Sequence, residues 1–402
     1  MFILEVTTLS TESHDRFAVI SGAGIAGLAA ALRLRRAGWR TLIVERAPER
    51  RSSGYLVNLL GYGYGAAENL GILPQLAPHD VGLFTTILVD RDGRHKLTTP
   101  RAVAEAAIGP RALSVFRGDL ETVLYQAVRD HTPIKFDTVI KAVSSEPDGV
   151  ALQLSDGTTQ HADLLIGADG LHSGVRRLVF GPDDEFRNDM GHLVGAFQLS
   201  EVPGDLPVGT GTTFIGPGRT GAVINLGPRR SSVFFTYRSS DVDSALAAGP
   251  VAALTDAFGD LGGGFPEALD HLRREPAEAY FDSVDQIVMN SWSRGRVVLL
   301  GDAAWCVTLF AGYGAALALT GADRLGDLLE RSDVDVPDAL ARWESQLRPE
   351  VSKRQALAAR GMARFAPANR TQVWLGETML RAMNLPGIRQ WVIRSVRRAN
   401  GR

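Results

Sequence analysis

The sequence predicts an α/β fold, of the mixed α+β kind, with a parallel sheet near the N-terminus, a second sheet in the middle of the chain and helices toward the C-terminus. Three observations predict it. A strand, a glycine-rich turn, a helix and a second strand follow one another over residues 16–44. Short alternating strands fill much of residues 190–240, and most of the sequence after residue 314 is helical.

The N-terminal elements start a parallel βαβ unit, with strands expected at 16–21 and 40–44 and a helix at 24–37. The regular alternation then stops, and a segment rich in Gly and Tyr at 52–71 predicts a loop. We expect a hairpin at 86–97 around the turn Asp92-Gly93, followed by a helix at 118–129.

The same patterns, hydrophobic periodicity and turn residues, predict the elements in the middle and at the end of the chain. Residues 134–161 predict a three-stranded meander that leads into an apolar strand at 163–166. The stretches HLVGAFQL, GTTFIG, GAVINL and SVFFTYR predict a separate sheet, with helical sequence near 241–273. GRVVLLGDAAWCVTLFAGYGAALAL, at 295–319, predicts strand, turn and helix. The basic tail RQWVIRSVRRANGR predicts a solvated helix on the body of the protein, favoured over a membrane-surface helix.

Composition excludes several classes of function. The 402 residues suit two intimately packed domains, and a net charge of −2 gives no field that favours nucleic acid or membrane. The lone cysteine, Cys306, excludes an intrachain disulfide and fits a reducing cytoplasm. No segment reaches the ~18 apolar residues of a membrane span. The eight histidines show no metal-ligand spacing. We therefore expect a cytoplasmic protein without a metal site.

The turn after the first strand carries the most informative motif. In Gly22-x-Gly24-x-x-Gly27 the first glycine makes the tight turn, the second admits a pyrophosphate, and the third lets helix and strand pack. Glu45 ends the second strand, where a carboxylate accepts hydrogen bonds from an adenosine ribose and would repel a 2′-phosphate. The combination predicts a Rossmann-like site for FAD or NAD, and the break in the βαβ pattern favours FAD. The residues expected around the pyrophosphate are Gly22, Ala23, Gly24, Ile25, Ala26 and Gly27.

Two later turns extend this prediction to the whole cofactor. ADLLIGADGLHSGVRR, at 162–177, delivers Asp169 to a tight turn; an Asp-Gly turn that only caps a helix is the alternative interpretation. Asp302 places a carboxylate where the ribityl hydroxyls of a flavin would pass, and the next helix aims its positive end at the edge of the ring that becomes negative on reduction. That helix is expected to begin near Gly312, Tyr313, Gly314 and Ala315.

These three motifs, in this order and spacing, resemble the single-component FAD-dependent aromatic-ring monooxygenases of the para-hydroxybenzoate hydroxylase type, and within them the tetracycline-inactivating branch. The resemblance extends from about residue 15 to residue 385. It implies an FAD-binding domain made of 15–80, 100–188 and 280–365, a sheet-rich substrate domain made of 81–99 and 189–279, and a C-terminal helical segment, 366–402. It also assigns four further positions, the last two more loosely: Arg46 beside the adenosine, Arg117 on FAD, Arg51 facing the nicotinamide donor, and Asn58 facing the flavin.

The activity implied by the resemblance is a monooxygenase that uses noncovalent FAD, NAD(P)H and O2 to hydroxylate or epoxidise an aromatic or polyketide-like small molecule. We expect a monomer or a weak homodimer. Two positions depart from the family pattern: Trp305 replaces His or Tyr, and Leu309 replaces a proline that shapes the oxygen pocket. The alternatives are a non-oxygenating flavoprotein of the same fold, such as a reductase or redox-neutral cyclase, and a non-enzymatic escort protein.

No catalytic side chain is predicted, because the chemistry implied by the resemblance depends mainly on positioning and on the exclusion of water. Eight residues are candidates to line a substrate pocket, although core packing is the more frequent role for each of them. They are Tyr55, Tyr62, Tyr64, His192, Phe214, Phe234, Tyr237 and Tyr313.

Overall fold

The computed structural model describes residues 15–50, 55–108, 111–201, 206–228, 230–308, 312–331 and 335–385, together with residue 387. Two positions singled out above, Arg51 and Leu309, lie outside these ranges, as does the basic tail 389–402. Within the described ranges, no helix has both the length and the apolar character needed to cross a membrane.

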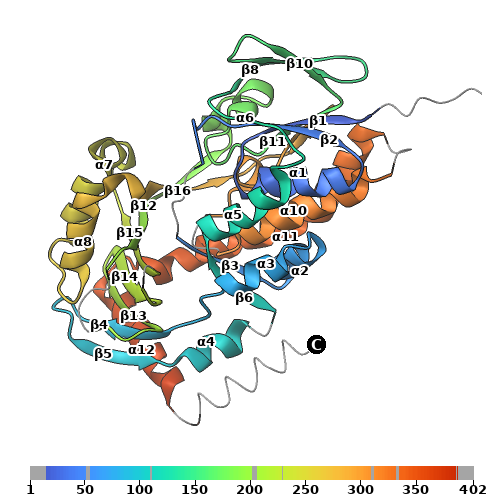
Figure 1. Cartoon of the computed structure of the whole chain (residues 1–402). Helices are drawn as coiled ribbons and strands as arrows, with labels where there is room; N and C mark the ends of the chain where they lie inside the picture. The colour runs from blue at the N-terminus through green and yellow to red at the C-terminus, as the bar shows by residue number, and fades with distance from the viewer. Residues whose placement is uncertain are drawn as a thin grey trace, which may run out of the picture.

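The first layer is a six-stranded sheet in the order β17-β18-β11-β1-β2-β7 (Figure 1). Its central strands β2, β1, β11 and β18 run parallel to one another. They are almost entirely buried and apolar, as expected of parallel strands covered on both faces. The strands are β1 (Phe17–Ser21), β2 (Arg40–Val44), β7 (Ile134–Lys135), β11 (Leu164–Gly167), β17 (Ser293–Arg294) and β18 (Val297–Leu299).

Helices α1 (Ile25–Arg36) and α10 (Gly314–Leu329) pack against each other beside this sheet (Figure 1). The predicted strands at 16–21 and 40–44 and the helix at 24–37 are confirmed to within one residue at each end. The predicted meander is confirmed as a three-stranded antiparallel sheet of β8 (Ile140–Ser145), β9 (Val150–Leu154) and β10 (Thr159–Ala162).

The loop predicted at 52–71 is wrong over most of its length. Residues 56–60 form strand β3 (Leu56–Leu60), which pairs with β6 (Ala112–Phe116), and residues 62–69 form helix α2 (Tyr62–Asn69). The glycines do not loosen this segment. A Cβ on Gly63 would lie 2.3 Å from the Cβ of Ala316 in α10, so this glycine lets two helices approach closely.

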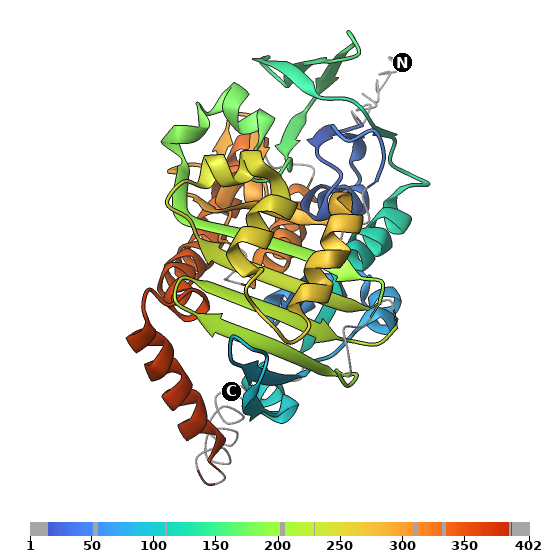
Figure 2. The same cartoon turned by 90° about the vertical axis from the view of Figure 1, so that its left-hand side faces the viewer.

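The second layer is a seven-stranded sheet in the order β16-β12-β15-β14-β13-β4-β5, which confirms the alternating strands expected from 190 onward and the hairpin at 86–97. Figures 1 and 2 show α7 (Val242–Phe258) and α8 (Phe265–Arg274) covering one of its faces. The strands are β4 (Thr85–Val89), β5 (His95–Thr99), β12 (Arg187–Leu199), β13 (Thr210–Gly216), β14 (Arg219–Asn225), β15 (Ser231–Arg238) and β16 (Tyr280–Ile287).

Trp305, one of the two departures from the family pattern, belongs to the core. Its ring packs against Trp292 and Trp343, with ring centroids 4.7 and 5.6 Å away, and all three side chains are fully buried. A Cβ on Gly321 of α10 would lie about 3 Å from the Trp305 ring. Trp305 therefore fills space behind α10.

The remaining helices either surround the first layer or extend the chain beyond it. The last of them, α12, projects from the body of the molecule (Figure 2). They are α3 (Leu73–Leu76), α4 (Arg101–Ile108), α5 (Arg117–Val128), α6 (Gly174–Val179), α9 (Asp302–Trp305), α11 (Val336–Phe365) and α12 (Arg370–Asn384).

Candidate functional site

The three motif turns follow three neighbouring parallel strands. The glycine-rich turn follows β1, the Asp169 turn follows β11, and Gly301-Asp302 follows β18. The order β18-β11-β1 places the carboxyl ends of these strands side by side at one edge of the sheet. In open α/β sheets this edge is where ligands bind.

Close backbone approach explains the glycines of the first turn. Gly22 has φ +105°, and a Cβ there would lie 2.5 Å from the carbonyl oxygen of Ala168, in the turn after β11. A Cβ on Gly27 would lie 1.9 Å from the oxygen of Gly22, so α1 can start against the turn only with glycine at 27. A Cβ on Gly24 would meet nothing closer than 3.7 Å. Gly24 caps α1 without a side chain, and the positive end of the helix is left open for an anion.

The carboxylate of Glu45 holds this turn from the next strand. It accepts hydrogen bonds from the backbone N–H groups of Ala23, at 2.7 Å, and Ala47, at 2.8 Å. Arg46, the next residue, is exposed, whereas Ile25 is buried at the start of α1. Ala26 reaches the third turn, since a Cβ built on Gly301 would lie 2.9 Å from the Cβ of Ala26.

Asp169 holds its own turn against β1 and α6. Its carboxylate accepts hydrogen bonds from the Ser173 hydroxyl at 2.5 Å, from the Val175 N–H at 3.1 Å and from the Ser21 hydroxyl at 3.4 Å. Ser173 is the N-cap residue of α6, and Asp169 supports it by accepting a hydrogen bond from a second N–H of the first turn, close to the helix-capping role of the alternative interpretation.

Arg176 ties this turn to the third one. Its side chain is 1% exposed and donates to the carbonyl oxygens of Leu171, at 2.6 Å, and Ala303, at 2.9 Å. It also pairs with Asp183 at 2.6 Å. One buried guanidinium thus fixes the Asp169 turn relative to the residue that follows Asp302.

Asp302 is the first residue of α9 and lies within the electrostatic reach of Arg117. Burial among protein atoms raises the pKa of its carboxyl, and the charge of Arg117 acts in the opposite direction. The residue is nevertheless exposed to solvent. The raised pKa and the exposure are compatible if many protein atoms lie near the carboxylate while water still reaches it. A Cβ on Gly314, at the start of α10, would lie 3.9 Å from the Asp302 carboxylate, so the positive end of that helix lies beside this side chain.

Two tyrosines meet beside Arg117. The rings of Tyr55 and Tyr280 are 5.0 Å apart, and the Arg117 guanidinium is 5.9 Å from the Tyr55 ring. Burial raises the pKa of Tyr55 to about 12, so its hydroxyl is neutral at physiological pH. Arg117 also pairs with Glu121 at 2.7 Å. Although burial disfavours the charge on Arg117, Glu121 and its neighbours outweigh that effect and raise its pKa.

The start of α10 is held by stacked cations and rings. The guanidinium of Arg354 lies 3.7 Å from the centre of the Tyr313 ring, and Tyr62 stacks on Tyr313 at 6.1 Å. Gly312 has φ +63°, and Ala315 is half-buried in the first turn of the helix. Asn58 accepts a hydrogen bond from the Ser114 hydroxyl of the paired strand β6, at 2.7 Å.

The eight pocket candidates divide between different parts of the molecule. Phe214 and Tyr237 pack in the core under α7 and α8, which is the role that the sequence favoured for each candidate. His192 is next to Leu193 on β12, and Phe234 is next to Phe235 on β15. Since side chains alternate along a strand, His192 and Phe234 face the side of the sheet opposite to α7 and α8. Tyr62, Tyr64 and Tyr313 pack against the core of the first layer.

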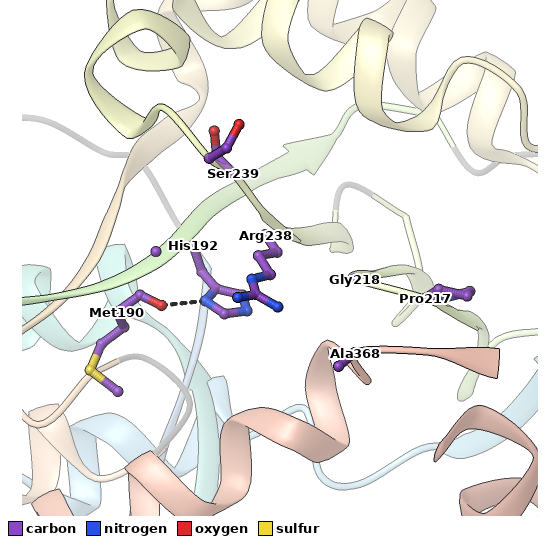
Figure 3. A pocket seen from close by; sticks show the side chains of 9 residues that line it. Met190, His192, Pro217, Gly218, Arg238, Ser239 and Ala368 are labelled. Atoms are coloured by element: carbon purple, nitrogen blue, oxygen red, sulfur yellow. Dashed lines mark hydrogen bonds between the residues drawn. The ribbon is translucent and has the colours of Figure 1, made fainter. Parts of the chain in front are cut away.

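A pocket of about 630 Å³ opens on that other side of the sheet, at the ends of β12 and β15 (Figure 3). His192 and Arg238 lie next to each other on its wall, as Figure 3 shows. The full lining is Met190, Gly191, His192, Pro217, Gly218, Arg238, Ser239, Ser240 and Ala368.

Residues 17–233, just over half of the chain, match the family described as FAD binding domain. The chain belongs to this family. It is 31% identical to the uncharacterized protein Rv1260 of Mycobacterium tuberculosis (strain ATCC 25618 / H37Rv), over 87% of this chain and 94% of that protein. It is 28% identical to a flavin-dependent monooxygenase of an unknown prokaryotic organism, over 91% of each chain.

Two solved structures share the architecture. Tetracycline destructase Tet(51) superposes with a TM-score of 0.76 at 26% identity, covering 96% of each chain. Klebsiella pneumoniae HpxO, complexed with FAD and uric acid, superposes with a TM-score of 0.77 at 23% identity, covering 96% of this chain and 97% of that one. The expected α/β fold, the FAD cofactor and the membership among flavin-dependent monooxygenases are thereby confirmed.

Sequence reasoning missed three residues that this flavoprotein brings to the site. They are Tyr280, Glu121 and, as a neighbour of Asp302, Cys306. Glu121 carried a usable signal, since it follows Arg117 by four residues on a predicted helix. Tyr280 carried none, because it reaches the site from a strand of the second sheet.

Proposed function

We propose that FAD lies along the carboxyl edge of the parallel sheet, with its pyrophosphate over Gly22–Gly27, its adenosine ribose at Glu45 and its flavin end at Asp302 and α10. The start of α1, where Gly24 brings no side chain to cap the helix, supports the pyrophosphate position. The single observation that carries the flavin position is Asp302, a carboxylate surrounded by protein yet wetted, between Arg117 and the start of α10. When bound, FAD would supply the redox chemistry: NAD(P)H would provide the electrons, and O2 would provide one oxygen atom to the substrate and the other to water.

The residues of this chain would then bind, orient and shield. The carboxylate of Asp302 accepts hydrogen bonds from ribityl hydroxyls, and the Arg117 guanidinium balances its charge. The N-terminus of α10 stabilises negative charge on the reduced ring. Tyr55 and Tyr280, neutral and packed together, exclude water from the space between the two sheets.

The domain division predicted from the sequence is part of this proposal, with one adjustment. Strand β16 pairs with β12 along most of its length, so it goes with the substrate domain. The substrate would bind between the free face of the seven-stranded sheet and the FAD-binding domain, where Tyr280 of one unit meets Tyr55 of the other.

We propose as substrate a medium-sized aromatic or polyketide-like molecule that is hydroxylated or epoxidised. The likeness to a tetracycline destructase at 26% identity supports a polycyclic ligand. We also propose that the protein is a cytoplasmic monomer or weak homodimer.

The test uses the FAD-loaded protein. In the absence of air, NAD(P)H should bleach its yellow colour. In a second experiment, under 18O2 and with a panel of polyphenols as substrates, one labelled oxygen atom should appear in a product. Reduction and reoxidation without labelled product would instead favour the reductase or cyclase alternative, and a protein that stays free of FAD would favour the escort protein.

A pair of matched variants tests where the cofactor lies. Gly24→Val should abolish FAD retention, because its side chain would fill the space above the start of α1. Gly376→Val, in α12, where a Cβ meets nothing within 4 Å, should retain FAD like the parent. Equal retention by both variants would contradict the pyrophosphate position.

A further inference from the structure

His192 and Arg238 are directly paired residues on neighbouring strands. They stand opposite each other in the register of β12 and β15, so their side chains project from the same face of the sheet. That face is the one turned away from α7 and α8, because Gly195 and Phe197, which alternate with His192, meet Leu254 and His271 of those helices. Both side chains line the pocket shown in Figure 3.

Arg238 brings an uncompensated charge to this wall. None of the ion pairs within the described residues includes it, although Arg187 and Arg219, the other two arginines in strands of this sheet, both have carboxylate partners. Its side chain is exposed to the pocket. A free guanidinium presents a planar set of donors that suits an anionic oxygen.

His192 brings a fixed acceptor next to that charge. Its Nδ1 lies 2.6 Å from the carbonyl oxygen of Met190, and a carbonyl only accepts, so Nδ1 carries the proton. Burial, helped by the nearby Arg238, lowers the pKa of His192, so the ring is neutral at physiological pH. Its Nε2 is then an unprotonated acceptor, which suits a ligand hydroxyl.

The separation between Tyr280, at the proposed flavin end, and the pair His192 and Arg238 sets the length of a ligand that touches both. On β12, Ala196 is paired with Tyr280 and His192 with Arg238, four residues apart on one face. Four residues of a strand span roughly 13 Å. A ligand that reaches from Tyr280 to Arg238 is therefore several fused rings long.

We propose that Arg238 and His192 bind the acidic end of the substrate, with the guanidinium on a carboxylate or acidic enol oxygen and the imidazole Nε2 accepting a hydrogen bond from a neighbouring hydroxyl. The proposal rests on the proposed function, because it takes the reacting ring to lie near Tyr280. A phosphate group of the nicotinamide donor fits this wall less well, since an ionised phosphate only accepts hydrogen bonds and would oppose the Nε2 lone pair.

The test measures equilibrium binding to the FAD-loaded protein by calorimetry. The probes are 4-hydroxyanthracene-2-carboxylate, its neutral carboxamide and its 4-methoxy analogue. The parent should bind the acid roughly tenfold more tightly than the carboxamide, and more tightly than the methoxy acid, which cannot donate. Arg238→Met should remove the preference for the acid, and His192→Phe should remove the preference for the hydroxyl.

The control is Arg274→Met, which removes the same charge from an exposed position on α8 and should leave both preferences intact. An acid preference that survives in Arg238→Met, or that is absent from the parent, would overturn the proposal. Weaker NADPH binding by Arg238→Met, with an unchanged acid preference, would assign the arginine to the reductant and overturn it as well. FAD retention and anaerobic bleaching, measured on the same samples, report separately on the proposed function.

Discussion

Replacing Arg176 by Met removes the buried group that ties two motif turns together while keeping the apolar stem. The guanidinium donates to the carbonyl oxygens of Leu171 and Ala303, which adjoin the Asp169 turn and Asp302. It shares the carboxylate of Asp183 with the neighbouring Arg177. The variant therefore leaves two carbonyl acceptors without this donor, whereas Asp183 keeps one partner.

The expected loss follows from these contacts. An acceptor left without a donor inside the protein costs about 1–3 kcal/mol, so losing the donors to the buried Ala303 carbonyl and the part-buried Leu171 carbonyl should lower the free energy of unfolding by about 2–6 kcal/mol in total. Arg177→Met is the matched control. It removes the same charge from the same carboxylate, but its side chain is 46% exposed, and an exposed pair contributes about 0–1 kcal/mol.

The measurement is urea unfolding at saturating FAD, followed by tryptophan fluorescence, together with the FAD dissociation constant. Arg176→Met should also bind FAD more weakly, because the turn that carries Asp302 loses its fixed position. Arg177→Met should match the parent in both respects. Equal losses of stability in the two variants would refute the reasoning, since burial would then not distinguish the two arginines.

Four further outcomes are expected. Glu45→Ala should weaken FAD binding by about 1–3 kcal/mol in a flavin-fluorescence titration, and unchanged affinity would contradict the ribose position. Acid precipitation should leave the yellow colour in the supernatant, because the FAD is noncovalent; a yellow pellet would show a covalent bond. The family pattern has a proline at position 309, so Leu309→Pro would be expected to improve the ratio of product formed to NAD(P)H consumed. A proline there requires that the preceding residue be extended. Thr308 has φ +76°, so this variant should lose stability and release more hydrogen peroxide, and improved coupling would contradict this. The hydrogen bond to Asp282 raises the pKa of His172 above its ordinary value of 6.5. The ion pair therefore stabilises the fold below pH 6.5, and this stabilisation is lost as the pH rises through the higher pKa of the folded state. The parent should exceed His172→Gln in unfolding free energy by less than about 1 kcal/mol at pH 5.5 and match it at pH 8.5, and a difference that persists at pH 8.5 would exclude the ion pair as its source.

The parts of the fold that the sequence predicts well are those specified by local signals. The glycine-rich turn, the apolar runs of the parallel strands and the Asp-Gly turns each depend on a few consecutive residues, and the structure places β1, α1 and β2 within a residue of expectation. The loop predicted at 52–71 was wrong because a long-range contact, and not a local signal, determines the structure there. One of its glycines, Gly63, serves a contact with Ala316 that no local pattern contains.

The two faces of the second sheet illustrate the same limit. Alternation along β12 and β15 shows that His192 and Phe197 lie on opposite faces, but both faces are apolar enough to be buried. Only the packing of α7 and α8 decides that Phe214 and Tyr237 enter the core and that His192 and Arg238 line a pocket.

The sequence by itself determined the α/β class, the FAD cofactor and the chemical type of each motif residue, because turn geometry and strand periodicity act over a few residues. The tertiary structure alone decided which of these residues meet. Tyr280, at the start of β16, meets Tyr55, which precedes β3, and Arg176 reaches Ala303 because β11 and β18 are neighbours. Such contacts depend on the pairing of distant strands, which is set by the burial of the whole core and is not encoded in any single stretch of residues.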